Sequence, residues 1–162
     1  MADRNQKEKR RKQVIDVLNQ ARGMELQATG QYMIQHYRLE AMDYGKLASK
    51  LKKIAIDEMR HAETFAERII ELGGEPSTSL AGKIVKGQSV EDMFPFNAEQ
   101  EEEAIAVYNQ FLVICRENLD SVTARILARA IDDEQAHLTD FQNIGEHIRR
   151  LGDRYLARLA GT

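Results

Sequence analysis

The chain has 162 residues, 30% of them charged, and a formal net charge of −3. This length predicts a single domain over residues 1–162, and the charge gives no basic field that would favour a nucleic-acid partner. One cysteine excludes an intramolecular disulfide and a four-cysteine metal knuckle. No apolar run approaches the length of a membrane span, and none follows the N-terminal residues, so we expect a cytoplasmic protein without a membrane partner.

The first predicted helix covers residues 6–41. Asn5 and Glu8 have the spacing of a capping box, which predicts a helix start near residue 6. Apolar residues then recur at alternating steps of three and four, as on one face of a helix. A basic cluster surrounds this start and is expected to lie in solvent rather than to bind nucleic acid. Its members are Arg4, Lys7, Lys9, Arg10, Arg11 and Lys12.

Three further long helices and a short one follow. The second should stop at Gly73-Gly74, after which Pro, Ser, Thr and Gly residues indicate an extended crossover over 75–88. Ser89 and Asp92 predict the cap of the third helix, which Pro95 should bend or restart. The predicted helix ranges are 44–73, 89–118, 121–151 and 154–160. We therefore expect an all-α, up-down four-helix bundle with one long crossover and a short C-terminal fifth helix.

Six ionisable side chains interrupt the apolar seams of the four long helices. These seams face the other helices, where a lone buried carboxylate is unfavourable unless it is neutralised or paired. Two of the helices carry Glu-x-x-His, whose glutamate and histidine lie on one helix face and can bind one centre. The six residues are Glu25, Glu58, His61, Glu101, Glu134 and His137.

The spacing of these residues predicts that they meet. In each half of the chain, the lone glutamate precedes the glutamate of Glu-x-x-His by 33 positions. Folding each pair of helices into a hairpin therefore brings the lone glutamate within about one helical turn of the motif. The halves also match at an offset of 76 residues, where 57–61 (DEMRH) corresponds to 133–137 (DEQAH). The sequence thus predicts one site with pseudo-two-fold symmetry.

Charge balance favours a pair of metal ions at this site. Four ionised glutamates carry four negative charges, which two divalent cations would cancel. Carboxylate-rich sites with one imidazole for each ion suit iron or manganese better than zinc. The alternative is that the six side chains lie on solvated helix faces, although the same seams are apolar above and below them.

Over nearly its whole length the sequence resembles bacterioferritin, a haem-containing, ferritin-like family. The matching stretches are MELQATGQYMIQHY, AIDEMRHAETFAERIIELGGEP and DDEQAHLTDFQNIGEHIRRLG. The resemblance implies a ferritin-like fold and a hollow cage of twenty-four subunits, built from two-fold dimers, that stores and detoxifies iron. It also implies a ferroxidase, which oxidises Fe(II) with O2 or hydrogen peroxide at a di-iron centre and deposits ferric mineral. A ferredoxin-like or other electron donor would serve iron release.

The resemblance assigns the six ionisable residues to two iron ions in each subunit. The bridging ligands would be Glu58 and Glu134. The remaining ligands would be Glu25 with His61 at one iron and Glu101 with His137 at the other.

Met59 has a separate role in this family, as the axial ligand of a haem (b-type or a variant) shared by two subunits. It lies about 100° around the helix from Glu58, so it cannot share the metal centre. Leu26, Gly30 and Met33 form the corresponding stripe on the first helix, where Gly30 would leave room for a partner to approach. Spacing alone favours Met59 as a packing residue at a dimer interface, and only the family resemblance favours it as a haem ligand.

Neighbours of the centre can also be predicted. Metal-bound histidines usually donate their free N–H to a carboxylate, so we expect Asp133 to orient His61 and Asp57 to orient His137. Tyr32 is expected either beside the centre or as an ordinary core aromatic residue.

Other residues and other functions complete the predictions. We expect His36 and His147 at a surface or interface and Cys115 in the core. The alternative functions are a rubrerythrin-like or manganese-catalase-like protein that removes peroxide, or a non-enzymatic iron- or haem-binding helical scaffold. Rubrerythrins usually append a rubredoxin domain with four cysteines, whereas this chain has one cysteine.

Overall fold

A computed structural model describes residues 2–161 of the chain. The helices are α1 (Ala2–Ala41), α2 (Gly45–Glu71), α3 (Val90–Glu117), α4 (Ser121–Leu151) and α5 (Asp153–Ala157). The predicted all-α four-helix bundle with a short fifth helix is confirmed. None of the described helices combines the length and the apolar character that crossing a membrane requires.

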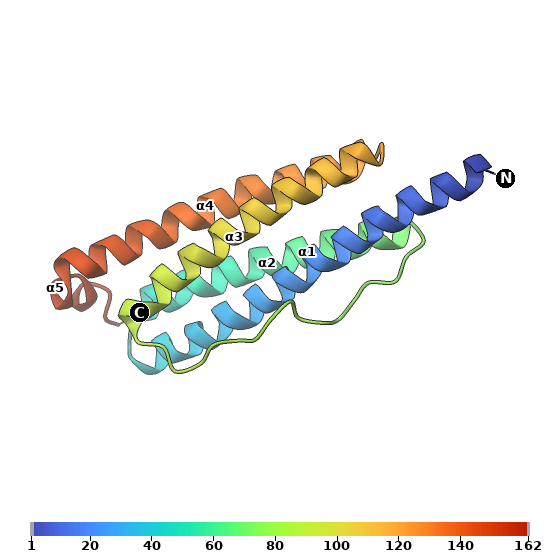
Figure 1. Ribbon diagram of the computed structural model, residues 1–162. Coiled ribbons are helices and arrows are strands. Elements are labelled where there is room, and N and C mark those ends of the chain that lie inside the picture. The colour runs from blue at the N-terminus through green and yellow to red at the C-terminus, as the bar shows by residue number, and fades with distance from the viewer. Residues whose placement is uncertain (1, 162) are drawn as a thin grey trace.

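The bundle consists of two helical hairpins (Figure 1). Helices α1 and α2 pack along each other, as do α3 and α4, and the contacts within each hairpin are far more extensive than those between the hairpins. The crossover between α2 and α3 runs back along α1 from one end of the bundle to the other (Figure 1). The space between the hairpins is therefore the place where side chains from all four long helices can meet.

Polar contacts attach the crossover to α1. The backbone N–H of Ala81 donates to the carbonyl of Gly23 at 3.0 Å. The side-chain amide of Gln31 donates to the carbonyl of Val85 and accepts from its N–H, both at 2.8 Å. A Cβ at Gly23 would lie 3.1 Å from the carbonyl oxygen of Ser79, so glycine permits this close approach.

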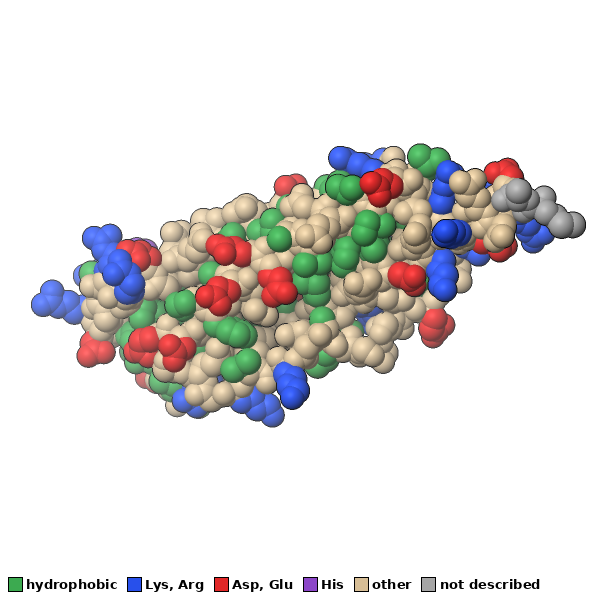
Figure 2. Space-filling model, in the orientation of Figure 1, with side chains coloured by type: hydrophobic (Ala, Val, Ile, Leu, Met, Phe, Trp, Pro, Cys, Tyr) green, Lys and Arg blue, Asp and Glu red, His purple; other side chains and the backbone are tan. Residues whose placement is uncertain are grey.

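The predicted start of the first helix is wrong. Helix α1 begins at Ala2, so Asn5 and Glu8 lie inside it and form no capping box. The residues around this point favour helix, and Arg4 and Glu8 pair across one turn at 3.8 Å, which supports continuation toward the N-terminus. The basic cluster lies on these first turns, which project beyond the other helices and form the blue region at the right of Figure 2.

The cap of α3 is confirmed. The hydroxyl oxygen of Ser89 accepts from the backbone N–H of Asp92 at 3.2 Å, and the hydroxyl donates to the Asp92 carboxylate at 2.7 Å. Helix α3 then continues through Pro95 without interruption, so a restart at this residue is wrong. Pro95 lies in the second turn, where its ring packs near Gly145 of α4.

Two apolar clusters fill the bundle, one on each side of the six ionisable residues along the helices. One contains Leu51 and Phe141, and the other contains Leu18 and Leu127. The predicted core position of Cys115 is confirmed, since it is buried in the second cluster. The seams are thus apolar above and below the ionisable residues, as their periodicity predicts.

The predicted surface or interface position of His36 is wrong within this chain. Its exposed fraction is only 4%, and its Nδ1 lies 2.8 Å from the carbonyl oxygen of Ala48 in α2. Such a bond satisfies a ring nitrogen inside the α1–α2 hairpin, which is why a histidine is tolerated there. His147, in contrast, is exposed on α4.

Candidate metal centre

The six ionisable residues meet between the two hairpins. Each long helix contributes at least one of them, and all six are buried, with exposed fractions from 1% to 9%. They form two groups of four, and within each group one ligand atom per residue lies within 4.8 Å of every other. The first group is Glu25, Glu58, His61 and Glu134, and the second is Glu58, Glu101, Glu134 and His137. Glu58 and Glu134 belong to both groups, so these two carboxylates can bridge two ions.

Both histidines direct the same ring nitrogen into the cluster. His61 Nδ1 lies 3.1 Å from Glu134 Oε1 and 3.5 Å from Glu25 Oε1. His137 Nδ1 lies 2.9 Å from Glu58 Oε1 and 3.1 Å from Glu134 Oε2. One imidazole therefore stands at each end of the bridging pair, as a site for two metal ions requires.

The outer nitrogen of each histidine faces an aspartate of the opposite hairpin. His61 Nε2 lies 3.0 Å from Asp133 Oδ2, and His137 Nε2 lies 3.5 Å from Asp57 Oδ2. The predicted hydrogen bond between His61 and Asp133 is confirmed, and Asp57 faces His137 as predicted but at ion-pair distance. A carboxylate at Nε2 favours the tautomer with the proton on Nε2, which leaves the Nδ1 lone pair free for a metal ion.

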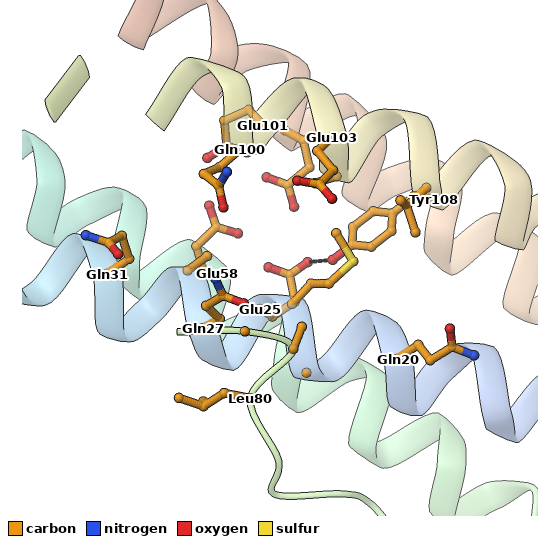
Figure 3. A pocket seen from close by; sticks show the side chains of 18 of the residues that line it. Gln20, Glu25, Gln27, Gln31, Glu58, Leu80, Gln100, Glu101, Glu103 and Tyr108 are labelled. Atoms are coloured by element: carbon orange, nitrogen blue, oxygen red, sulfur yellow. Dashed lines mark hydrogen bonds between the residues drawn. The ribbon is translucent and has the colours of Figure 1, made fainter. Parts of the chain in front are cut away.

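Two tyrosines hold the outer glutamates from across the bundle. The hydroxyl of Tyr32 in α1 donates to Glu101, and the hydroxyl of Tyr108 in α3 donates to Glu25. The bond between Tyr108 and Glu25 is drawn in Figure 3. Both predicted descriptions of Tyr32 hold, because it is a buried member of the first apolar cluster and its hydroxyl reaches the centre. The role of Tyr108 was not predicted, although it lies 76 residues after Tyr32, at the offset of the internal repeat.

The protonation of the cluster reflects its crowded charges. Burial alone would lower the pKa of both histidines, but contacts with Glu134 and the other carboxylates raise that of His137 to about 10 and that of His61 still further. Burial, reinforced by neighbouring carboxylates, raises the pKa of Glu25 and Glu101 well above 4.5. For Glu134 burial acts in the same direction, but contacts with the two histidines outweigh it and hold its pKa below 4.5. In the metal-free protein, bound protons therefore neutralise part of the negative charge of the carboxylates. Divalent ions could neutralise this charge instead.

Three atoms of the cluster show that these residues suit metal ions. Among the described residues, Glu58 Oε1, His61 Nδ1 and Glu134 Oε1 are buried and have no partner with hydrogen-bond geometry. A buried polar atom without a partner is unfavourable by about 1–3 kcal/mol. All three belong to groups that offer ligand atoms to a common point, so bound ions would satisfy them.

A cavity of about 700 Å³ connects the cluster with the surface. All four glutamates and both tyrosines line it, and the rest of its wall comes from α1, α3 and the crossover. Figure 3 shows Glu25 and Glu58 facing Glu101 across this space, with Leu80 of the crossover near its edge. Leu80 and Glu103 are exposed, so the cavity opens to solvent and gives small reactants access. The sequence carried no sign of this cavity.

Met59 lies apart from the cluster. Its exposed fraction is 51%, and it stands on the outer surface of α2. Leu26 and Met33 are half-buried, which leaves part of each side chain accessible on α1. The expectation for Gly30 is wrong, because the Ile84 side chain of the crossover already occupies the space that a Cβ there would need.

Comparisons with known proteins agree with this geometry. A family profile described as a ferritin-like domain matches residues 15–151. A bacterioferritin from Desulfovibrio desulfuricans is 59% identical over 96% of this chain and 87% of its own length. A bacterioferritin from Streptomyces coelicolor is 31% identical over 87% of this chain and 84% of its own length.

Solved structures lead to the same family. The X-ray structure of the Desulfovibrio desulfuricans bacterioferritin superposes with a TM-score of 0.96, at 59% identity, over 96% of this chain and 91% of that one. That structure is described as showing a diiron site in different catalytic states. The fold, the carboxylate–histidine cluster and these similarities together mean that the chain belongs to the bacterioferritin family.

Proposed function

We propose that this chain oxidises Fe(II) at the six-residue cluster and stores the ferric product. Its family is one of iron-storage ferroxidases with a di-iron centre, and this chain shares that function. The assignment of particular residues is supported above all by Glu58 and Glu134, which occur in both ligand groups. The diiron site of the Desulfovibrio desulfuricans protein supports the same assignment. The comparisons favour this function over the rubrerythrin-like, catalase-like and scaffold alternatives.

Each ligand has a distinct task in this proposal. Glu58 and Glu134 bridge the two iron positions and keep them close together. Glu25 with His61 completes one position, and Glu101 with His137 completes the other. Hard carboxylate ligands stabilise the higher charge of Fe(III) relative to Fe(II) and so favour oxidation. When bound, the pair of irons supplies the electrons that reduce O2 or hydrogen peroxide.

The surrounding residues keep these ligands in place. Tyr32 and Tyr108 each hold one oxygen of an outer glutamate and so limit rotation of its carboxylate. Asp57 and Asp133 hold the histidine rings in the orientation that directs Nδ1 into the cluster. Burial between two apolar clusters limits access largely to the cavity, which excludes competing ligands.

Aerobic addition of Fe(II) to the metal-free protein tests the ligand assignment. We expect the rate of oxidation to saturate with the concentration of Fe(II). The total amount oxidised should exceed two irons per chain, because the product leaves the centre for the mineral. Glu58→Ala should abolish the saturable phase, since it removes a ligand common to both ions. Glu63→Ala is the matched control, because Glu63 is an exposed glutamate on the same helix. Retained saturation in Glu58→Ala would contradict the assignment.

Met59 is the proposed ligand of a haem shared by two subunits. Its thioether is exposed and lies on the side of α2 where Ile56 is half-buried, so a partner subunit can reach it. Bound haem supplies an electron-transfer group, which suits the reduction of stored ferric iron during release. We expect Met59→Leu to lose the Soret band while its particle size stays unchanged on size-exclusion chromatography. A Soret band that persists in this variant would contradict the assignment.

The remaining parts of the proposal concern assembly and setting. Residues 1–162 form one domain, and twenty-four such chains build a hollow cage from two-fold dimers. Fe(II) and O2 or hydrogen peroxide are the small-molecule partners, and a ferredoxin-like or other electron donor serves release in the cytoplasm. Self-assembly into an oligomeric cage is a property of this family, which supports the finer proposal.

A further inference from the structure

The two halves of the chain supply the centre with matching ligands but place different charges beside the orienting aspartates. At the offset of 76 residues, Asp57 corresponds to Asp133. The residue three positions later is Arg60 in the first half and Ala136 in the second. The residue immediately before the aspartate is Ile56 in the first half and Asp132 in the second. The symmetry of the ligands is therefore not shared by their surroundings.

In the first half, the two carboxylate oxygens of Asp57 contact different residues. Arg60 Nη1 donates to Asp57 Oδ1 at 3.4 Å, while Asp57 Oδ2 lies 3.5 Å from His137 Nε2. The guanidinium of Arg60 thus offsets the negative charge of the group that holds His137. The side chain of Asp57 is 30% exposed, so solvent screens this charge only partly.

In the second half, the corresponding carboxylate serves one partner. Asp133 Oδ2 lies 3.0 Å from His61 Nε2, and within residues 2–161 Asp133 forms no other ion pair. Asp133, whose side chain is 63% exposed, thus has no cationic partner besides His61 within the described residues, whereas Arg60, 69% exposed, offsets the charge of Asp57 near His137.

This difference acts on the metal through the histidines. A carboxylate that accepts from Nε2–H increases the electron density at Nδ1 and so strengthens the bond from Nδ1 to a cation. An acceptor that is also paired with a guanidinium is weaker in this respect. The net negative charge near His61 acts in the same direction, because it favours a cation at that end of the centre.

We propose that Arg60 makes the two metal positions unequal. The position completed by Glu25 and His61 binds a divalent cation more tightly than the position completed by Glu101 and His137. Because the charges concerned are partly exposed, the ratio of the two affinities is about threefold to tenfold beyond the statistical factor. This inference rests on the proposed function, since it takes the six residues as metal ligands.

Anaerobic titration of the assembled, metal-free protein with Co(II) at low ionic strength tests the inference. The visible absorption of Co(II) reports each binding step without any turnover. Arg60→Ala should strengthen the weaker step and leave the tighter one unchanged. Ala136→Arg should weaken the tighter step and leave the weaker one unchanged. The double variant, which moves the arginine from one half to the other, should restore two unequal steps.

Two further variants separate a specific effect from a general one. Arg60→Lys keeps the charge and should retain most of the inequality. Arg125→Ala removes an equal charge from an exposed site nine residues before Glu134 on α4, about 13 Å along the helix, and should change neither step.

The possible outcomes distinguish the inference from the proposed function. Equal affinities in the unaltered protein, or no change in either step in Arg60→Ala and Ala136→Arg, would overturn the inference. Binding of two Co(II) ions per chain would still support the ligand assignment in that case. Fewer than two ions per chain would instead contradict the proposed function itself.

Discussion

At the residue scale, the outer glutamates of the centre are held by tyrosines from the opposite hairpin. Tyr108 donates to Glu25, and Tyr32 donates to Glu101. A hydroxyl bond of this kind fixes one carboxylate oxygen and so limits how far the carboxylate can rotate beside the metal positions. The pair also joins the two hairpins at the depth of the centre, so ligand position and hairpin packing depend on the same contacts.

We expect Tyr108→Phe to slow Fe(II) oxidation by about tenfold, comparable with losses on removing other supports of metal ligands. The physical reason is that Glu25 loses its donor and can rotate away from its metal position. Stopped-flow measurement of the initial oxidation rate checks this. Tyr32→Phe should behave alike by symmetry, whereas Tyr37→Phe alters a tyrosine that is 57% exposed and serves as the control. Equal rates for all three variants would contradict the role of the buried hydroxyls.

At the scale of elements, helix boundaries depend on both local caps and the surrounding chain. Ser89 caps α3 because a non-helical crossover precedes it, so its hydroxyl can accept from the N–H of Asp92. Asn5 has a similar sequence signature, yet α1 extends beyond it to Ala2. A cap contributes only about 1 kcal/mol, so favourable helix-forming residues before it can override it.

Ser89→Ala is expected to destabilise the protein by about 1 kcal/mol, because the backbone N–H of Asp92 at the start of α3 loses its side-chain acceptor. The measurement is urea-induced unfolding of the metal-free protein followed by circular dichroism. Ser49→Ala is the control, since Ser49 is exposed inside α2 and caps nothing. A loss of stability of the same size in both variants would mean that the cap has no specific effect.

At the scale of the whole molecule, the metal-free bundle contains a buried charged cluster stabilised by protons. The pKa of His137 is raised from 6.5 to about 10 in the folded chain. A group with a raised pKa stabilises the fold fully below its unfolded value and loses that contribution as pH rises toward the folded value. The raised pKa values of Glu25 and Glu101 have the same effect, because the stability that they contribute is lost as pH rises above 4.5.

The stability of the metal-free protein should therefore fall as pH rises from about 6.5 to about 10. Bound divalent ions replace the protons, so the metal-loaded protein should keep its stability over most of this range. Thermal unfolding at a series of pH values, with and without Co(II), measures both effects. His137→Gln should make the fall in stability of the metal-free protein between these pH values shallower. A metal-free profile that is already flat would show that protonated His137 does not stabilise the fold.

Much of the fold and of the centre could be predicted from sequence because the relevant information is periodic. Apolar steps of three and four identify helices and their buried faces, and polar residues on those faces stand out against them. The equal spacing of Glu25 from Glu58 and of Glu101 from Glu134 indicates two hairpins with their ligands at one level. Helix geometry converts such spacings directly into distances along the helix axis, so the sequence alone predicts that the six residues meet.

Only the tertiary structure decided how the hairpins and the crossover meet. The bond between Tyr108 and Glu25, the cavity over the glutamates, the burial of His36 and the contact of Ile84 with Gly30 all join segments far apart in sequence. Such contacts depend on how far each helix is rotated and shifted against its neighbours. Periodicity gives the buried face of one helix, but side-chain packing between helices sets these rotations and shifts.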